Sequence, residues 1–189
     1  MRRNNPLLLI ITGPPCSGKT TIGQRLVHDL RLPYFYKDGI KEILFDTLGW
    51  KDRDWSRQLG RACIALLFYI AEAQLSAGYS LALESNFEAS LAASAFLALQ
   101  KRHPHTALVV QCTASRSILF ERYKQRSVSG ERHPGHVDHT LYAEFDSQSF
   151  DPPRYRLEIG APIFEIDTSD FLKLDYNKLL QSITSHLDG

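Results

Sequence analysis

The stretch that most constrains this chain runs from Gly13 to Thr20 and reads GPPCSGKT. It matches the phosphate-loop (Walker A) pattern G-x-x-x-x-G-K-[ST]. The apolar run Leu7 to Ile11 comes directly before it and a segment with helical spacing comes directly after it, which is the strand-loop-helix setting that this motif needs. A chance match in a glycine-containing turn is the alternative, and this setting disfavours it. The motif predicts that the chain binds a nucleoside triphosphate.

The residue types in this loop fit a polyanionic ligand. Gly13 and Gly18 permit backbone angles that let the chain wrap an anion closely, and the first turn of the next helix offers unpaired N–H groups and a partial positive charge. Because the two prolines have no N–H, the cradling amides should come from residues 16–20. We expect Lys19 to reach the β and γ phosphates and the Thr20 hydroxyl to bind magnesium. The predicted nucleotide-binding residues are Gly13, Pro14, Pro15, Cys16, Ser17, Gly18, Lys19, Thr20 and Thr21.

Strands and helices are predicted to alternate along the chain. Apolar runs predict strands at 7–11, 34–36, 80–84, 106–112 and 163–167. Helical spacing predicts helices after the phosphate loop and over 40–48, 55–77, 89–101, 114–126 and 176–187. This alternation indicates an α/β fold whose parallel sheet is covered on both faces. With 189 residues and no repeat or linker, the chain is expected to be one domain over 1–189.

Ligands bind at the carboxyl ends of the strands in such sheets, so the residues that follow strands are candidates for chemistry. Asp38 follows the second strand and is the candidate general base, because phosphoryl transfer needs a group that takes the proton of the acceptor hydroxyl. The alternative is that Asp38 only caps a helix beginning at Gly39. That helix is expected to bury one apolar face, made of Ile40, Ile43, Leu44, Thr47 and Leu48.

Glu84 ends the third strand and is the second candidate carboxylate. It would hold magnesium through a water molecule or bind the acceptor, since a carboxylate buried there without a partner would be costly. The alternative is a solvated strand end, which would cost nothing.

A basic segment covers 101–136, with seven Lys or Arg against two Glu, whereas 137–189 holds ten acids against four bases. Arg122 and Arg126 are four residues apart on one helical face, and Arg132 follows on a Gly- and Pro-rich flap over 127–139. Arginines that close over a triphosphate would stabilise the charge on the transferred group, and a merely solvated helix face is the alternative. The flap also carries His133, His136 and His139. Their spacing invites a zinc assignment, but thiolates are absent, and we favour substrate contact or plain polarity.

Composition excludes few classes of protein. The hydrophobic content of 43%, the charged content of 23% and the formal charge of +1 are ordinary for a soluble globular chain and give no general case for a nucleic-acid or membrane partner. Three widely spaced cysteines do not form a disulfide framework and indicate a reducing compartment. The ten-residue apolar run at 62–71 is too short to span a bilayer. The expectation is a soluble, cytoplasmic protein.

With these residues placed, the chain resembles the P-loop kinases of the polynucleotide-kinase, zeta-toxin and small-molecule phosphotransferase type, relatives of gluconate, shikimate and nucleoside monophosphate kinases. The resemblance implies a five-stranded parallel sheet of order 2-3-1-4-5 in a three-layer fold, with a lid at about 122–140 that closes over ATP. The family motif D-x-x-R after the second strand matches Asp38 to Lys41, with lysine in place of arginine. Its D-T-N-like segment matches Glu84, Ser85 and Asn86, and 167–168 matches the segment near the adenine. The acceptor-binding residues implied are Asp38, Lys41, Glu84 and Asn86.

The leading hypothesis is therefore an ATP- and magnesium-dependent kinase that phosphorylates a hydroxyl of a small metabolite, nucleoside or antibiotic. Its catalytic residues would be Lys19, Asp38, Arg122, Arg126 and Arg132. The alternative within enzymes is a 5′-hydroxyl kinase for oligonucleotides, which the local positive charge favours. The alternative of another class is a nucleotide-binding regulatory or toxin-like partner protein.

Overall fold

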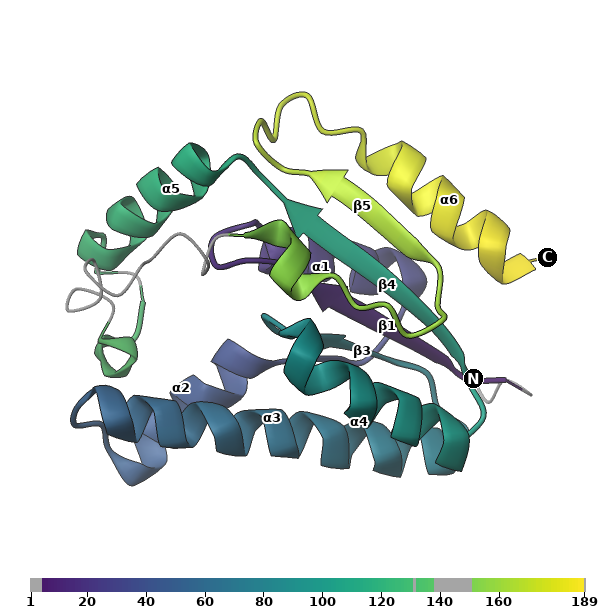
Figure 1. Cartoon of the computed structure of the whole chain (residues 1–189), viewed down its shortest axis with the longest axis horizontal. Helices are drawn as coiled ribbons and strands as arrows, with labels where there is room; N and C mark the ends of the chain where they lie inside the picture. The colour runs from purple at the N-terminus through teal and green to yellow at the C-terminus, as the bar shows by residue number, and fades with distance from the viewer. Residues whose placement is uncertain (1–4, 131, 138–150, 189) are drawn as a thin grey trace.

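The computed structural model describes residues 5–130, 132–137 and 151–188. Within these residues five parallel strands form one sheet in the order β2-β3-β1-β4-β5, so the order expected from the resemblance is confirmed (Figure 1). The strands are β1 (Leu7–Thr12), β2 (Tyr34–Tyr36), β3 (Leu81–Glu84), β4 (Thr106–Thr113) and β5 (Ile163–Asp167).

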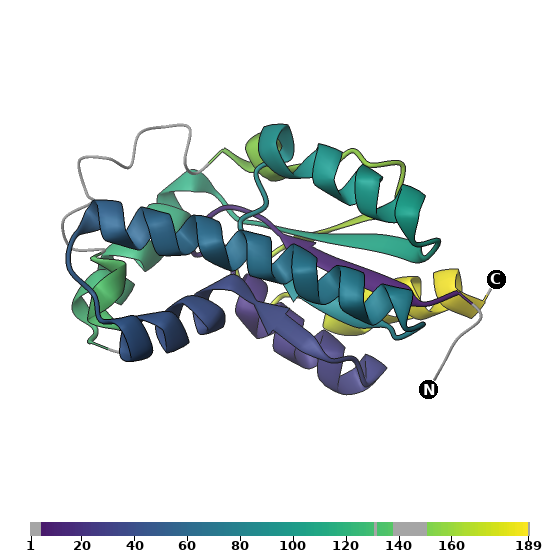
Figure 2. The same cartoon turned by 90° about the horizontal axis from the view of Figure 1, so that it is seen from below.

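Helices cover both faces of the sheet, and alternation along β1 shows how the sequence produces this. Leu8 and Ile10 face α3 (Arg53–Ser76) and α4 (Ala89–Arg102), whereas Leu9 and Ile11 face α1 (Lys19–Leu30) and α6 (Tyr176–Asp188). A strand buried on both faces needs apolar residues at every position, as the run from residue 7 to residue 11 provides. Figures 1 and 2 show the sheet between these layers.

The remaining elements gather at the end of the sheet where the strands have their carboxyl ends (Figures 1 and 2). They are α2 (Lys37–Leu48), α5 (Arg116–Val128) and the short 3-10 helix η1 (Pro134–His136). A second 3-10 helix, η4 (Pro152–Tyr155), follows in the chain. The predicted lid at about 122–140 thus falls on the end of α5 and on η1, while His139 lies outside the described residues.

Helix α2 corrects the sequence-based expectation in two ways. It begins at Lys37 with Tyr36 in the N-cap position, so Asp38 lies inside the first turn and the alternative, that Asp38 only caps a helix beginning at Gly39, is wrong. The predicted apolar face is wrong in part: Ile40 and Leu44 are half-buried and Ile40 packs against the core, but Ile43 and Leu48 are 63% and 59% exposed and Thr47 is exposed too.

The inward side of α2 instead carries Lys41 and Phe45, which are 6% and 1% exposed. Apolar spacing pointed to the wrong side because a lysine occupies a buried position. A buried lysine is uncommon unless it has a partner or a ligand.

Helix α3 is 24 residues long and buries Leu59, Cys63, Leu67, Ala71 and Leu75. By length and composition alone this helix could cross a membrane, so the apolar segment is longer than the ten-residue run at 62–71 counted from the sequence. Core helices of soluble proteins pass the same test, and one such helix is weak support for a membrane segment.

Candidate active site

The phosphate loop joins β1 to α1 through a turn that depends on glycine. Gly13 has φ of 143°, and a Cβ atom there would lie 2.2 Å from the carbonyl oxygen of Cys112. Gly18 has φ of 72° and forms the N-cap of α1. Cys16 also adopts a left-handed conformation, with φ of 62°, which is uncommon for a residue with a side chain. Backbone strain of this kind collects at ligand sites.

Lys19 is folded back onto the loop. Its ammonium group donates to the Pro14 carbonyl at 2.6 Å and lies 3.5 Å from the Ser17 hydroxyl. Burial lowers the pKa of Lys19, and the charge of Glu84 partly opposes this. A phosphate oxygen would be a stronger partner for this buried cation than a neutral carbonyl.

A pair of hydroxyl groups converges on Glu84, which is 6% exposed. Thr20 Oγ1 donates to Glu84 Oε2 at 2.9 Å, and the Tyr34 hydroxyl donates to the same oxygen at 2.6 Å. Burial and then the charge of Glu84 raise the pKa of Tyr34 well above its usual range, so this phenol stays a donor. Glu84 is therefore a buried, partnered carboxylate rather than a solvated strand end.

Hydroxyl and carboxylate oxygens are the ligand types that magnesium prefers, so Thr20 and Glu84 fit the predicted metal side of the site. Within the described ranges, no group of three or more His, Cys, Asp or Glu side chains forms a cluster that would hold a metal ion on its own. A magnesium ion here would rely on phosphate oxygens and water for its other ligands.

Asp38 lies at one end of a hydrogen-bonded chain that reaches η1. Arg132 Nη2 donates to Asp38 Oδ2 at 2.8 Å and lies 2.9 Å from His136 Nδ1, while His136 Nε2 lies 3.0 Å from Glu42 Oε1. A guanidinium group only donates, so Nδ1 accepts and the proton of this imidazole is on Nε2, facing Glu42. These hydrogen bonds tie α2, at two positions four residues apart, to Arg132 and to His136 of η1.

Burial and the charges along these hydrogen bonds favour an ionised Asp38 and a neutral His136. Burial raises the pKa of the Asp38 carboxyl, but the charge of Arg132, followed by that of Lys37, outweighs it and leaves the pKa below its usual range. Burial and the charge of Arg132 lower the pKa of His136 to about 2.

The other flap histidine that the structure describes also faces α2. His133 stacks on the Phe45 ring with centroids 5.1 Å apart, and its Nε2 lies 3.2 Å from Asp46 Oδ1. His136 sits edge-on to the same ring, with centroids 5.3 Å apart. Both histidines therefore serve to dock η1 on α2.

The two arginines of α5 play different parts. Arg122 Nη2 donates to the Thr168 and Ser169 carbonyls at 2.6 and 3.2 Å, and its guanidinium lies 5.0 Å from the centre of the Phe171 ring. It thus holds the segment after β5 beside the phosphate loop. Arg126 lines the cavity one turn further along α5.

These parts line one cavity of about 590 Å³. Among the predicted site residues it brings together Pro15, Cys16, Gly18, Lys19, Thr20, Thr21, Asp38, Lys41, Glu84, Asn86, Arg122, Arg126 and Arg132. Gly13, Pro14 and Ser17 shape the loop without lining the cavity.

Sequence reasoning missed several residues of this site. Lys37, Arg53 and Arg57 line the cavity, and Tyr34 supports it from behind Glu84. The two arginines lie in the first turns of α3, where no local sequence motif identifies them as residues of the site. One feature could have indicated Tyr34 as a residue of the site: it lies on the short strand that pairs with β3 and leads to Asp38.

The family model described as AAA domain matches residues 8–147 of the chain. Among solved structures, a protein from Chloroflexus aurantiacus J-10-fl, whose assignment as a kinase is itself provisional, is 38% identical over 97% of each chain, with a TM-score of 0.84. No curated protein matched the chain.

Two more distant structures share the fold. A gluconokinase from Sinorhizobium meliloti 1021 is 18% identical, covering 98% of this chain and 97% of its own, with a TM-score of 0.51. Chaetomium thermophilum Kti12, solved with ADP-AlF3, is 16% identical, covering 94% of this chain and 97% of its own, with a TM-score of 0.66.

Proposed function

The chain belongs to the AAA domain family, and on that premise we propose that it is a phosphotransferase that uses ATP and magnesium to phosphorylate a hydroxyl group of a small molecule. One observation carries the proposal: Lys19 of the phosphate loop and Asp38 line the same cavity, together with the three arginines of the lid region. Phosphoryl transfer requires this combination of charge neutralisation and a proton acceptor. A small-molecule acceptor is further supported by the fold shared with a gluconokinase.

In the proposed reaction Asp38 accepts the proton of the acceptor hydroxyl while that oxygen attacks the γ-phosphorus and the bond to the β–γ bridging oxygen breaks, releasing ADP. Lys19 and at least one of Arg122, Arg126 and Arg132 stabilise charge on the transferred group. Thr20 and Glu84 would hold magnesium, which when bound supplies further neutralisation of the phosphates. Asn86, beside Glu84, would contact the acceptor.

Release of Asp38 is part of this proposal. A carboxylate whose pKa is depressed by Arg132 is a weak base, so the reaction gains if Arg132 moves from Asp38 onto the phosphates when ATP binds. The predicted lid at about 122–140 would supply that movement. We place the reaction in the cytoplasm, where ATP and free thiols such as those of the three cysteines occur.

The experiment is transfer of labelled γ-phosphate to a panel of hydroxy acids, sugars, nucleosides and antibiotics. A labelled product supports the proposal, and slow hydrolysis alone across the whole panel contradicts it. Asp38→Asn should lower transfer by about 10²- to 10⁴-fold and leave the affinity for a non-hydrolysable ATP analogue unchanged. Glu72→Gln, a carboxylate of α3 paired with Arg102 and His103, is the matched control and should behave as wild type.

An oligonucleotide 5′-hydroxyl kinase is the second candidate, because the described lining of the cavity holds eight Lys and Arg against two carboxylates. Rapid labelling of a short oligonucleotide that weakens steeply with salt would favour it. The third candidate is a nucleotide-binding protein that regulates a partner. Stable binding to a partner that is unimpaired in Asp38→Asn would favour it.

A further inference from the structure

The outward sides of α3 and α4 are apolar, although both helices already pack on the sheet with their inward sides. The sequence holds no Asp, Glu, Lys or Arg over 62–71 of α3 or over 89–100 of α4. The two helices are neighbours here, since the Phe68 and Phe96 rings have centroids 4.8 Å apart, and Figure 2 shows both helices on one side of the sheet. We name their exposed large side chains the α3–α4 face: Leu66, Tyr69, Leu91 and Leu97.

The helix layer on the other side of the sheet is solvated in the ordinary way. The exposed residues of α1 and α6 include Gln24, Arg25 and Lys178. Of the side chains that the structure describes on these two helices, no large apolar one is exposed, whereas Tyr69 of α3 and Leu91 of α4 are 72% and 73% exposed. Grouped apolar side chains on a protein surface mark a region that contacts another molecule. The difference between the two layers therefore indicates that a partner covers the α3–α4 face.

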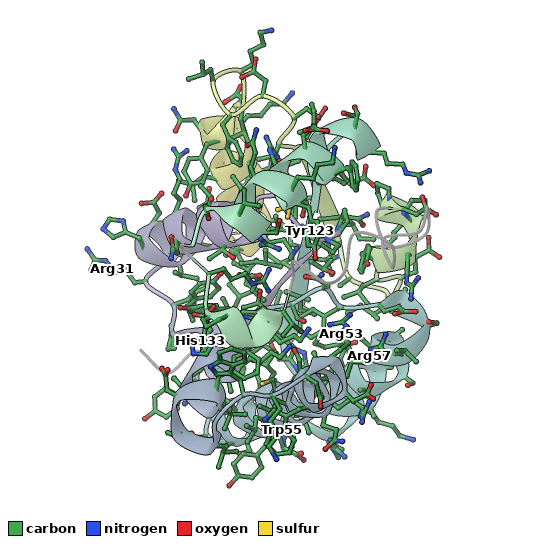
Figure 3. All side chains as sticks on the ribbon, turned by 90° about the vertical axis from the view of Figure 1, so that its left-hand side faces the viewer. Arg31, Arg53, Trp55, Arg57, Tyr123 and His133 are labelled. Carbon is green, nitrogen blue, oxygen red and sulfur yellow. The ribbon has the colours of Figure 1, made fainter. Side chains whose placement is uncertain are left out.

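This face points away from the candidate active site. In Figure 3, Arg53 lies on the side of α3 toward Tyr123 of α5, whereas Trp55 lies on the outer side. Leu66 follows Trp55 by 11 residues, which is close to three turns of helix, so these two residues lie on the same side of α3. Arg53 lines the cavity and the residues of the α3–α4 face do not. A partner on this face would therefore leave the cavity open.

The α3 part of the face is complementary to itself. Ala62 and Ala65 are exposed beside Leu66 and Tyr69, at the spacing of one helix face. In an antiparallel pair of α3 helices whose two-fold axis passes between residues 65 and 66, Tyr69 of one copy lies opposite Ala62 of the other, and Leu66 lies opposite Ala65. Each large side chain then meets a small one, which lets two helices pack closely. A parallel pair would set Tyr69 against Tyr69.

Charges at the border of this face fit the same arrangement. Arg61 and Glu72 are 11 residues apart, so they flank the face on one side of α3, one before its centre and one after it. In the antiparallel pair, Arg61 of one copy comes within two residues of Glu72 of the other, or about 3 Å along the helix axis, and the symmetry makes this contact twice. Glu72 also pairs with Arg102 and His103 of its own chain, and a carboxylate has oxygen lone pairs for a further donor. A parallel pair would instead oppose like charges.

The size of the face suits a weak but specific dimer. From Gln58 to Ala73 the exposed side of α3 is about 24 Å long, at 1.5 Å per residue, and two adjacent helices are about 20 Å wide. The face of each copy therefore covers about 500 Å², or on the order of 1,000 Å² for the two copies together, which is the lower end of the range for specific interfaces.

We propose that two copies of this chain associate through the α3–α4 face, as a two-fold symmetric dimer whose α3 helices run antiparallel. Leu66 and Tyr69 form its centre, and Arg61 and Glu72 of the two copies pair at its border. A tyrosine and leucines at the centre with charges at the rim match the composition of protein interfaces. The inference does not depend on the proposed function.

Self-association of the full chain is the first test. In sedimentation velocity, the wild-type chain should shift from monomer to dimer as its concentration rises from about 1 to 300 µM, as expected for an interface of this size. Leu66→Lys and Tyr69→Lys each place a charge at the centre and should weaken association at least about tenfold. Leu172→Lys, at a leucine that is 98% exposed after β5, is the matched control and should associate as wild type. Because all three positions are exposed, thermal unfolding at the lowest concentration should be unchanged.

A charge exchange tests the antiparallel arrangement. Arg61→Glu alone should oppose two glutamates across the interface, and Glu72→Arg alone should oppose two arginines, so each variant should associate at least about tenfold more weakly than wild type. An equal mixture of the two variants pairs Glu with Arg at both contacts and should recover dimers that contain one copy of each. A cooperative thermal transition of each variant, measured before mixing, checks that it is folded.

A chain that stays monomeric at every concentration overturns the inference. If that monomer floats with phosphatidylcholine vesicles, the face binds lipid, and if it does not, the face belongs to another protein. A dimer that both Leu66→Lys and Tyr69→Lys retain forms through a different surface and also overturns the inference. So does a mixture of folded charge variants that fails to recover association. The phosphate-transfer assay tests the proposed function separately.

Discussion

At the residue scale, Arg132 is involved in two competing interactions, one with Asp38 and one with the phosphates of the proposed ATP. In this structure its guanidinium donates to Asp38 and lies within hydrogen-bond distance of His136, whereas the proposed reaction gains if this charge moves to the phosphates. The same contact that keeps Asp38 ionised also makes it a poor proton acceptor, because the charge that lowers a pKa lowers basicity with it.

Replacing Arg132 tests this coupling. In Arg132→Gln the largest opposing charge is gone, and burial then acts against the remaining charges, of which that of Lys37 is the largest. The pKa of Asp38 should therefore rise, and the acid limb of the profile of kcat/KM against pH should move upward by about one unit or more. The transfer rate should fall by about 10²- to 10³-fold as charge stabilisation is lost. Arg132→Lys keeps the charge and should leave the acid limb near its wild-type position. An unmoved limb in Arg132→Gln would show that Asp38 is not the base.

Lys41 supports a prediction about stability. It is next to Lys37 and Asp38 on α2, Arg53 on α3 and Arg132 on the lid, and its pKa is about 8 in the folded protein against 10.5 for an unperturbed lysine. The unfolded chain therefore binds more protons between these pH values, so this residue makes the folded state more stable as pH rises through that window.

Lys41→Met should consequently raise the free energy of unfolding at pH 7 by about 1–3 kcal/mol, because it removes a buried charge that costs stability. The advantage over wild type should shrink above pH 8 as the lysine loses its proton. Urea unfolding at several pH values measures it, with the exposed Lys101→Met as control. A variant less stable than wild type at pH 7 would refute the assigned cost.

At the scale of elements, α2 joins the proposed base to the η1 part of the predicted lid. Its first turn carries Asp38 into the cavity, and its middle carries Glu42 and Phe45, on which η1 is docked. A Cβ atom on Gly135 of η1 would lie only 2.7 Å from Phe45 Cγ, which is closer than real contacts allow.

Gly135→Ala should therefore force η1 away from α2. We expect a loss of about 1–3 kcal/mol from overpacking and a lower transfer rate, since Arg132 is displaced with η1, while affinity for the ATP analogue stays unchanged. Adding Phe45→Leu, which shortens the opposing side chain, should recover part of both losses. Denaturant unfolding and the transfer assay give the two readouts, and a fully stable single variant would contradict this docking geometry.

Elements with a strong local pattern were predictable. The phosphate loop, the buried strands and the closing helix predicted over 176–187 follow from glycine placement and apolar spacing, and all are observed. The face of α2 was not predictable this way, because a charged residue fills an inward position. Arg53 and Arg57 were missed for a related reason, since only the packing of α3 against α2 brings them to the cavity.

At the scale of the whole molecule, charge is segregated. The chain has 22 Lys and Arg and 21 Asp and Glu, of which the described lining of the cavity holds eight and two; the rest of the sequence, described and undescribed residues together, holds 14 bases and 19 acids. A cleft whose described lining is positively charged focuses the electric field and draws anions in.

Salt should then affect charged and neutral acceptors differently. With ATP saturating, kcat/KM for an anionic acceptor should fall severalfold between about 0.05 and 0.5 M sodium chloride, because screening shortens the reach of the cleft, whereas a neutral acceptor should change little. Steady-state rates at a series of salt concentrations measure this. Parallel curves for the two acceptors would argue against steering by the cavity.

The short strand β2 carries one more consequence. Tyr34 at its start donates a hydrogen bond to Glu84 on the predicted metal side, the Tyr36 ring stacks on the Tyr34 ring with centroids 5.2 Å apart, and Asp38 follows within two residues of the end of the strand. Because β2 is three residues long and is paired along its length with β3, it sets the spacing between the predicted metal side and the proposed proton acceptor. Inserting a single residue would turn one half to the opposite face of the sheet. The length of β2, rather than the identity of any one residue in it, would then keep the predicted metal side and the proposed proton acceptor aligned.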